Sequence, residues 1–178
     1  MRSSPVAAPA SLPKVDSGPS AEHVAASSSK SVVLCLGNRY LGDDGIGISV
    51  AEALKGVLAS DVLIEASQTM DLPLLSQCEG ARRVVVVDAL KSGARPGEVS
   101  RYALVPSGTP LEALKGPHSL ELHDFFDIAW HTGLLNCPVI VVGIEPKDCG
   151  IGEGLSNELA RAIPRVVEEV KAALSYRA

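Results

Sequence analysis

The chain has 178 residues and a formal net charge of −5, a length at which one domain is expected. Hydrophobic residues make up 46% of it and aromatic residues only 3%, so its core has to be built from Val, Leu, Ile and Ala. Its longest run of basic residues is the pair Arg82–Arg83, which excludes the basic stripe that a nucleic-acid-binding protein needs.

The cysteine pattern and the length of the apolar runs indicate the cellular compartment of the protein. The four cysteines include no C-x-x-C, so a zinc knuckle is not indicated, and Cys35 lies in an apolar run where a buried structural thiol is expected. No apolar run approaches the roughly 20 residues that span a bilayer, and residues 1–30 lack the apolar stretch of a secretory signal. We therefore expect a cytoplasmic protein with reduced cysteines and no membrane partner.

Two segments differ sharply in composition. Residues 1–30 are rich in Ala, Ser and Pro and have few large apolar groups, which predicts a disordered tail. From residue 31 to 178 the chain reads as one folded domain. In chain order its apolar patterns predict a strand at 32–36, a helix from 46 to 58, a strand at 61–64, a helix at 71–79, strands at 83–87 and 97–104, a helix at 119–131, a strand at 138–142 and a helix from 155 to 174.

This order of elements predicts the fold class. The four consecutive valines at 84–87 show no alternation, which indicates a strand covered on both faces, as in a parallel sheet. Pro164 should kink the last helix or begin its second half. We expect an α/β fold, a three-layer α/β/α sandwich of the phosphorylase/hydrolase-like kind with a mainly parallel twisted sheet of about five strands.

Polar residues directly after the strands are the candidates for chemistry, because ligands of open α/β sheets gather beyond the carboxyl ends of the strands. These residues are Asn38, Asp43 and Asp44 after the first strand, Asp88 after the third and Glu145 after the last, with His118 just before a helix.

The acidic loop after the first strand favours a cation. Its glycines do not have the G-x-G-x-x-G spacing of a dinucleotide site, and carboxylates at a helix start would repel a phosphate. Asp44, Asp88 and His118 together suit a divalent metal of borderline hardness, such as nickel or zinc, and three ligands leave positions open for water or substrate. The dipole of a helix that begins just after His118 would keep its ring neutral.

Structural interpretations stay open beside this one. Asp43 and Asp44 could cap the helix that follows them, Asp88 could cap the end of its strand, and His118 could be an ordinary surface or core residue. For His123 and His131, within or at the end of a predicted helix, we prefer the structural interpretation.

Four motifs, in order, resemble the hydrogenase maturation protease family. They cover the chain from about 32 to 174, and Gly116 stands where the family's third motif has Ser. They are Leu36-Gly37-Asn38-Arg39-Tyr40-Leu41-Gly42-Asp43-Asp44-Gly45-Ile46-Gly47, Val86-Val87-Asp88-Ala89, Pro117-His118-Ser119-Leu120, and Gly143-Ile144-Glu145-Pro146 with the helix start Leu155-Ser156.

The resemblance implies a function. It implies an endopeptidase that removes a C-terminal extension from the large-subunit precursor of a [NiFe] hydrogenase after nickel insertion. It places the metal-contacting residues on Asp44, Asp88 and His118, which would recognise nickel carried by the substrate, so that no permanently bound cofactor is expected. We expect the enzyme to be a monomer.

One turn departs from the family. Many relatives carry an Asp-Gly-Gly-Thr-like turn after the second strand, where this chain has Glu65-Ala66-Ser67-Gln68-Thr69. The loss of both glycines changes the backbone angles that the turn can adopt. Because the turn should border the cleft, we expect it to bear on which hydrogenase is recognised.

The attacking group is not evident from the sequence. Neither a G-x-S-x-G elbow nor a recognisable Cys–His pair occurs, so we expect attack by water, with Asp43 as the candidate base. Two other functions stay open: a germination-type protease on the same fold, and a non-catalytic metal-sensing chaperone that assembles the large subunit.

Overall fold

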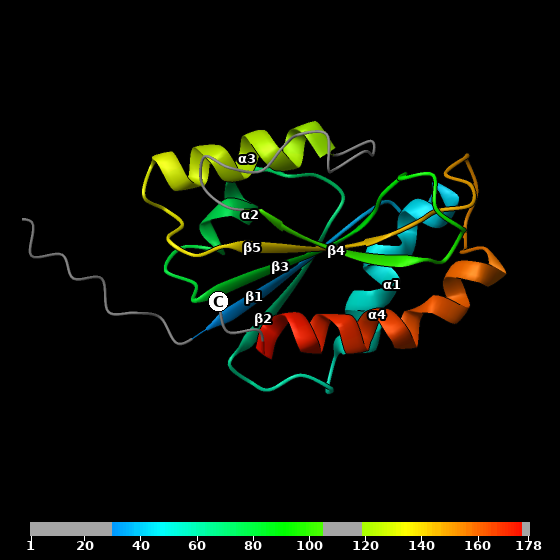
Figure 1. The fold of residues 1–178 in the computed structure, drawn as a ribbon, viewed down its shortest axis with the longest axis horizontal. Coiled ribbons are helices and arrows are strands. Elements are labelled where there is room, and N and C mark those ends of the chain that lie inside the picture. Colours follow the sequence, from blue (N-terminus) through cyan, green and yellow to red (C-terminus); the bar gives the residue numbers. More distant parts are fainter. Residues whose placement is uncertain (1–29, 105–118, 176–178) are drawn as a thin grey trace, which may run out of the picture.

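The computed structural model describes residues 30–104 and 119–175, and within them a sheet lies between two layers of helices (Figure 1). The predicted tail lies outside these ranges except for Lys30. The elements are β1 Ser31–Leu36, a 3-10 turn η1 Gly42–Gly45, α1 Ile46–Leu54, β2 Val62–Ser67, α2 Leu72–Ser76, β3 Arg83–Ala89, β4 Val99–Leu104, α3 Ser119–His131, β5 Val139–Ile144 and α4 Asn157–Ser175.

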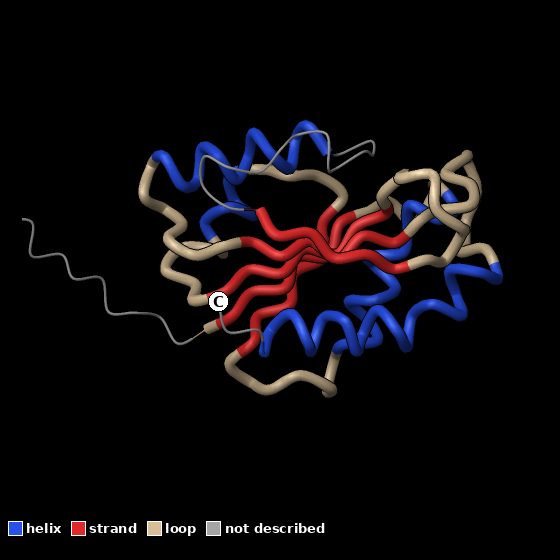
Figure 2. Tube along the Cα trace, viewed as in Figure 1, coloured by secondary structure: helices blue, strands red, loops and turns tan. Residues whose placement is uncertain are grey.

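The sheet has five strands in the order β2-β1-β3-β5-β4. β1 pairs in parallel with β2 and with β3, and β3 pairs in parallel with β5, whereas β4 runs antiparallel to β5. The predicted fold, with a mainly parallel sheet of about five strands, is therefore confirmed. Because four strands run the same way, their carboxyl ends meet at one edge of the sheet, where the loops gather (Figure 2).

Each face of the sheet is covered by its own helices. α2 and α3 lie on one side and α1 and α4 on the other (Figure 1). Val84 and Val86 belong to the core under α2 and α3, and Val85 and Val87 to the core under α1 and α4. This alternation explains the uninterrupted valine run, since both faces of β3 are buried.

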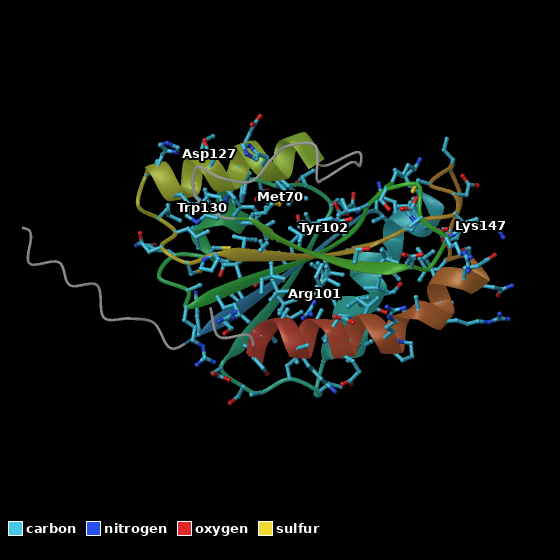
Figure 3. The ribbon with its side chains drawn as sticks, in the orientation of Figure 1. Met70, Arg101, Tyr102, Asp127, Trp130 and Lys147 are labelled. Carbon is cyan, nitrogen blue, oxygen red and sulfur yellow. The ribbon has the colours of Figure 1, made fainter. Side chains whose placement is uncertain are left out.

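The two helical layers bury different side chains. The core under α1 and α4 is aliphatic, while Phe126 and the partly buried Trp130 lie in the core under α3. Trp130 belongs to α3, and Met70 packs against the same core, on the α3 side of the sheet in Figure 3. Cys35 is fully buried in β1, and burial raises the pKa of its thiol to about 12, which confirms it as a structural cysteine.

Several boundaries differ from the sequence prediction. α1 ends at Leu54 instead of residue 58, because Lys55 is extended and Gly56 has a φ of +75°, which interrupts the helix. β2 begins at Val62 and continues three residues further than predicted, to Ser67. Pro164 lies inside α4 without ending it. In the described part of the chain, each helix is too short or too polar to cross a bilayer.

Candidate functional site

Asp43 joins the loop after β1 to the loop after β5. Its Oδ2 accepts hydrogen bonds from the backbone N–H groups of Lys147 and Asp148 at 2.8 and 3.1 Å, and its Oδ1 accepts one from Ser156 at 2.6 Å. The side chain is buried. Burial raises the pKa of Asp43, but the hydrogen bonds from Ser156, Asp148 and Lys147 outweigh burial and lower it.

Backbone hydrogen bonds hold the same two loops together. Gly42 N–H donates to Gly152 C=O at 2.8 Å, Gly152 N–H donates to Tyr40 C=O at 2.9 Å, and Asp43 N–H donates to Asp148 C=O at 2.9 Å. Lys147 lies on the second loop beside the start of α4 (Figure 3). The two loops therefore form one unit at the carboxyl edge of the sheet.

Asp44 turns its carboxylate back toward the end of β1. Its Oδ2 accepts a hydrogen bond from Asn38 N–H at 2.8 Å, and its side chain is buried. This return needs Gly37, which has a φ of +142° and where a Cβ atom would come within 1.9 Å of Asp44 C=O. The helix start after η1 has no side-chain cap, so the predicted capping of α1 by Asp43 or Asp44 is wrong: each carboxylate bonds to loop amides instead.

Asp88 lies near the carboxyl end of the central strand β3 and is fully buried. Its Oδ1 accepts a hydrogen bond from Ala89 N–H at 2.8 Å. Side chains alternate along a strand, so Asp88, two residues after Val86, lies on the face of the sheet that α2 and α3 cover. The β1–β3 register pairs Cys35 with Val87, so Leu36 lies beside Asp88, and η1, which carries Asp44, packs against β3.

Glu145 binds a third loop. Its Oε2 accepts hydrogen bonds from the N–H and the hydroxyl of Ser92, both at 2.7 Å, and its Oε1 accepts one from Gly93 N–H at 3.2 Å. Burial raises the pKa of Glu145, but these hydrogen bonds lower it by more. Glu145 therefore fixes the connection between β3 and β4.

Three of the four histidines follow residue 31, and they divide into two groups. His118 lies outside the described residues, directly before the first residue of α3 in the sequence. His123 and His131 lie on α3, where their ring nitrogens approach Asp124 and Asp127 on the same helix. In the described part of the chain, neither of these two rings contacts the carboxylates at the sheet edge.

The structure does not assemble a complete metal site from the described residues. Within residues 30–104 and 119–175 no group of three or more His, Cys, Asp or Glu side chains could hold a metal ion. Asp44 and Asp88 are there, and the predicted third ligand, His118, lies outside these ranges. What the described residues offer is two buried carboxylates at adjoining loop and strand ends.

A pocket of about 500 Å³ lies beyond Asp43, between the loop after β5 and the start of α4. Asp43 lines it, but both oxygens of Asp43 already accept backbone hydrogen bonds, and neither Asp44 nor Asp88 lines it. We therefore place the candidate chemistry at Asp44 and Asp88 and not in this pocket.

Sequence reasoning missed the anchoring roles of Asp43 and Glu145. Their partners lie far along the chain, at separations of 104 to 113 residues for Asp43 and 52 to 53 for Glu145. The signal available in the sequence was an acidic residue in the segment after a buried strand, together with segments rich in glycine and serine elsewhere in the chain.

Comparison with known proteins supplies the context of this site. A family model described as hydrogenase maturation protease matches residues 48–173. The hydrogenase 2 maturation protease of Escherichia coli K12 is 29% identical over 148 residues, which cover 80% of this chain and 89% of that protein. The protein FrxA of Pyrococcus furiosus is 29% identical over 131 residues, covering 72% and 93%.

Solved structures are similar across nearly the same span. The hydrogenase maturating endopeptidase HybD from E. coli has a TM-score of 0.70 and 27% identity, with 82% of this chain and 91% of that chain covered. The [NiFe] hydrogenase maturation protease HybD from Thermococcus kodakarensis has a TM-score of 0.67 and 24% identity, covering 81% and 99%, and supports the fold.

Proposed function

Because this chain belongs to the hydrogenase maturation protease family and is an endopeptidase of hydrogenase maturation, we propose that it removes a C-terminal extension from a [NiFe]-hydrogenase large-subunit precursor. Cleavage follows nickel insertion, and the enzyme recognises nickel that the substrate already holds. Nickel is thus part of the substrate and not a cofactor of the enzyme.

One observation carries the proposal. Asp88 is buried at the carboxyl end of the central strand, and η1, which carries Asp44, packs against the same strand. Asp88 also faces the layer of α3, whose first residue directly follows His118 in the sequence. Two carboxylates and an imidazole form the ligand set that we propose contacts nickel.

The reaction that we propose is hydrolysis by water. The water oxygen adds to the carbonyl carbon of the scissile peptide, the C–N bond breaks, and the leaving nitrogen takes up the proton that the water gives. Substrate-borne nickel anchors the precursor and polarises the carbonyl or the water.

Asp43, the base that the sequence suggests, is better suited to a structural role. Its two oxygens accept three backbone hydrogen bonds, and these lower its pKa. A carboxylate held in this way is a weaker proton acceptor than an ordinary aspartate. We propose that Asp43 fixes the loops around the site.

The deciding experiment is to incubate the full chain with a large-subunit precursor, nickel-loaded or nickel-free, and to measure the intact mass of the precursor. We expect loss of the C-terminal extension from the nickel-loaded precursor alone. Asp88→Ala and His118→Ala should abolish the loss, since each removes a proposed contact to nickel.

The other outcomes identify the alternatives. Complete cleavage by Asp88→Ala or by His118→Ala would remove that residue from the mechanism. Equal cleavage of the nickel-free precursor would favour a germination-type protease. A tight complex with no change of mass would favour an assembly chaperone.

A further inference from the structure

The outer edge of β2 offers backbone groups for pairing. Within the described ranges β2 pairs with β1 alone, and Ser67 C=O points toward β1, where it accepts from Gly37 N–H at 3.1 Å. The amide direction alternates along a strand, so Ile64 and Ala66 turn their N–H and C=O groups outward. These groups have no backbone partner in the described part of the chain.

A pocket lies directly beside this open edge. Its volume is about 190 Å³, and it lies between the end of β2 and α2. Its lining is mixed, with apolar, hydroxyl, amide and carboxylate groups: Glu65, Ala66, Ser67, Asp71, Pro73, Leu74 and Gln77. An added strand gains affinity from main-chain hydrogen bonds and specificity from such a side-chain pocket.

The two carboxylates of this pocket differ. Asp71 caps α2, since its Oδ1 accepts a hydrogen bond from Leu74 N–H at 2.9 Å. Glu65 is half-buried, and its carboxylate has no hydrogen bond or ion pair with another described residue. In the β1–β2 register Glu65 pairs with Leu34, which lies in the core under α2 and α3, so both side chains share that face. The charge of Glu65 is therefore available to a ligand on the α2 side.

We propose that β2 binds an extended segment of the substrate polypeptide as an additional strand and that Glu65 pairs with a Lys or Arg of that segment. Backbone groups of the segment bond to Ile64 and Ala66. Its side chains alternate between faces, so a basic residue opposite Glu65 lies roughly 5 Å away across the strands. This inference rests on the proposed function for the identity of the substrate.

The position of the edge fits a segment continuous with the cleaved one. β2 ends at the same edge of the sheet as β3, which carries Asp88, and β1 lies between them. A strand added outside β2 is three spacings from β3, or roughly 14 Å. An extended chain covers this in roughly four residues, so the bound segment lies at least that far from the scissile bond.

The first test measures binding without cleavage. The ¹⁵N-labelled full chain is titrated with a synthetic hexapeptide of alternating Lys and Val, and with its analogue in which Glu replaces Lys. We expect saturable shifts of the Ile64 and Ala66 amide signals with the Lys peptide only. Glu65→Gln should weaken the affinity for this peptide about fivefold, which is the effect of losing one partly exposed charge pair.

The second test measures processing of the nickel-loaded precursor. Glu65→Gln should raise KM about fivefold and leave kcat within about twofold. Ala66→Pro should also raise KM, since it removes an outward N–H without removing a bond to β1. Glu79→Gln, a matched change of an exposed glutamate before β3, should change neither constant.

Either of two results would overturn the inference. One is a wild-type KM in both Glu65→Gln and Ala66→Pro. The other is peptide shifts centred on Tyr102 of the opposite edge strand β4. The two proposals fail separately. A chain that binds the Lys peptide at Ile64 and Ala66 but leaves every precursor intact supports the edge site and refutes the proposed function.

Discussion

Two sets of buried carboxylates lie at the same edge of the sheet and are used differently. The anchoring carboxylates, Asp43 and Glu145, each accept three hydrogen bonds from loops that are distant in the sequence. The proposed site carboxylates, Asp44 and Asp88, each accept a bond from a nearby backbone N–H: Asp44 from Asn38, six residues away, and Asp88 from Ala89, the next residue. Burial is similar in both sets.

Burial of an acid at a strand end therefore does not by itself identify a catalytic residue, because Asp43 and Glu145 are about as buried as Asp44 and Asp88 and bond to loop amides. Carboxylate oxygens whose charge is spread over several backbone donors stabilise loops and become weak bases. The directions of the two pKa shifts, both downward for the anchoring carboxylates, agree with that role. The comparison makes Asp43 and Asp44, adjacent in sequence, a matched pair for experiment.

The largest expected effect separates that pair. Asp44→Asn should lower kcat/KM for the nickel-loaded precursor by about 100-fold or more, since a proposed nickel contact loses its charge, with a change in unfolding free energy of about 1 kcal/mol or less. Asp43→Asn should lower the unfolding free energy by about 2–4 kcal/mol, because an amide cannot satisfy three N–H donors. Urea denaturation and the processing assay measure both quantities for each variant.

Asp148→Asn is the control for this pair, because Asp148 is exposed and close to Asp43 in space. This substitution should leave both the unfolding free energy and kcat/KM nearly unchanged. If Asp43→Asn and Asp44→Asn lose stability equally and activity equally, the distinction between anchoring and site carboxylates is wrong.

Glu145→Gln should have a smaller effect on stability, about 1–2 kcal/mol. The amide keeps one acceptor oxygen for Ser92 but loses the charge that strengthens the bonds. Because the lost bonds are confined to one loop, limited proteolysis should begin between β3 and β4. Cleavage appearing first in the loop after β5 would contradict this assignment.

The smallest effect that we expect is the pH dependence that the anchoring carboxylates share. Their folded-state pKa values lie below the ordinary values of 3.8 for Asp43 and 4.5 for Glu145, so the unfolded chain binds more protons in this range. Their contribution is present above about pH 5 and is lost as pH falls through the folded-state pKa values. Urea titrations from pH 6 to 3 should show this loss, and Asp43→Asn should reduce its slope.

Local patterns predicted most of the fold. The valine run of β3 and the four-residue spacing from Ile46 identify a strand and a helix from neighbouring residues alone. The errors came where backbone geometry overrode the pattern: Gly56, with its positive φ, ended α1 early. The resemblance to a family, confirmed by the family match over residues 48–173, supplied the activity, which periodicity does not encode.

The site was predictable only in part. Strand-end placement indicated Asp44 and Asp88, because the carboxyl ends of parallel strands meet. The use of Asp43 was not predictable, since its donors Lys147 and Ser156 are 104 and 113 residues away. Local sequence indicates which residues can cap a helix, but neither aspartate caps α1: Asp43 bonds to amides more than 100 residues away, and Asp44 bonds back to Asn38 N–H.

The same long-range bonds set an order of events during synthesis. A chain made from its N-terminus completes β1, η1 and α1 well before Lys147, Asp148 and Ser156 leave the ribosome. Until then the Asp43 carboxylate lacks the amides that fix its loop against the sheet. A nascent chain that ends before β5 therefore lacks the amides that bond to Asp43, and the loop that carries Asp43 and Asp44 is fixed only once the segment after β5 has been made.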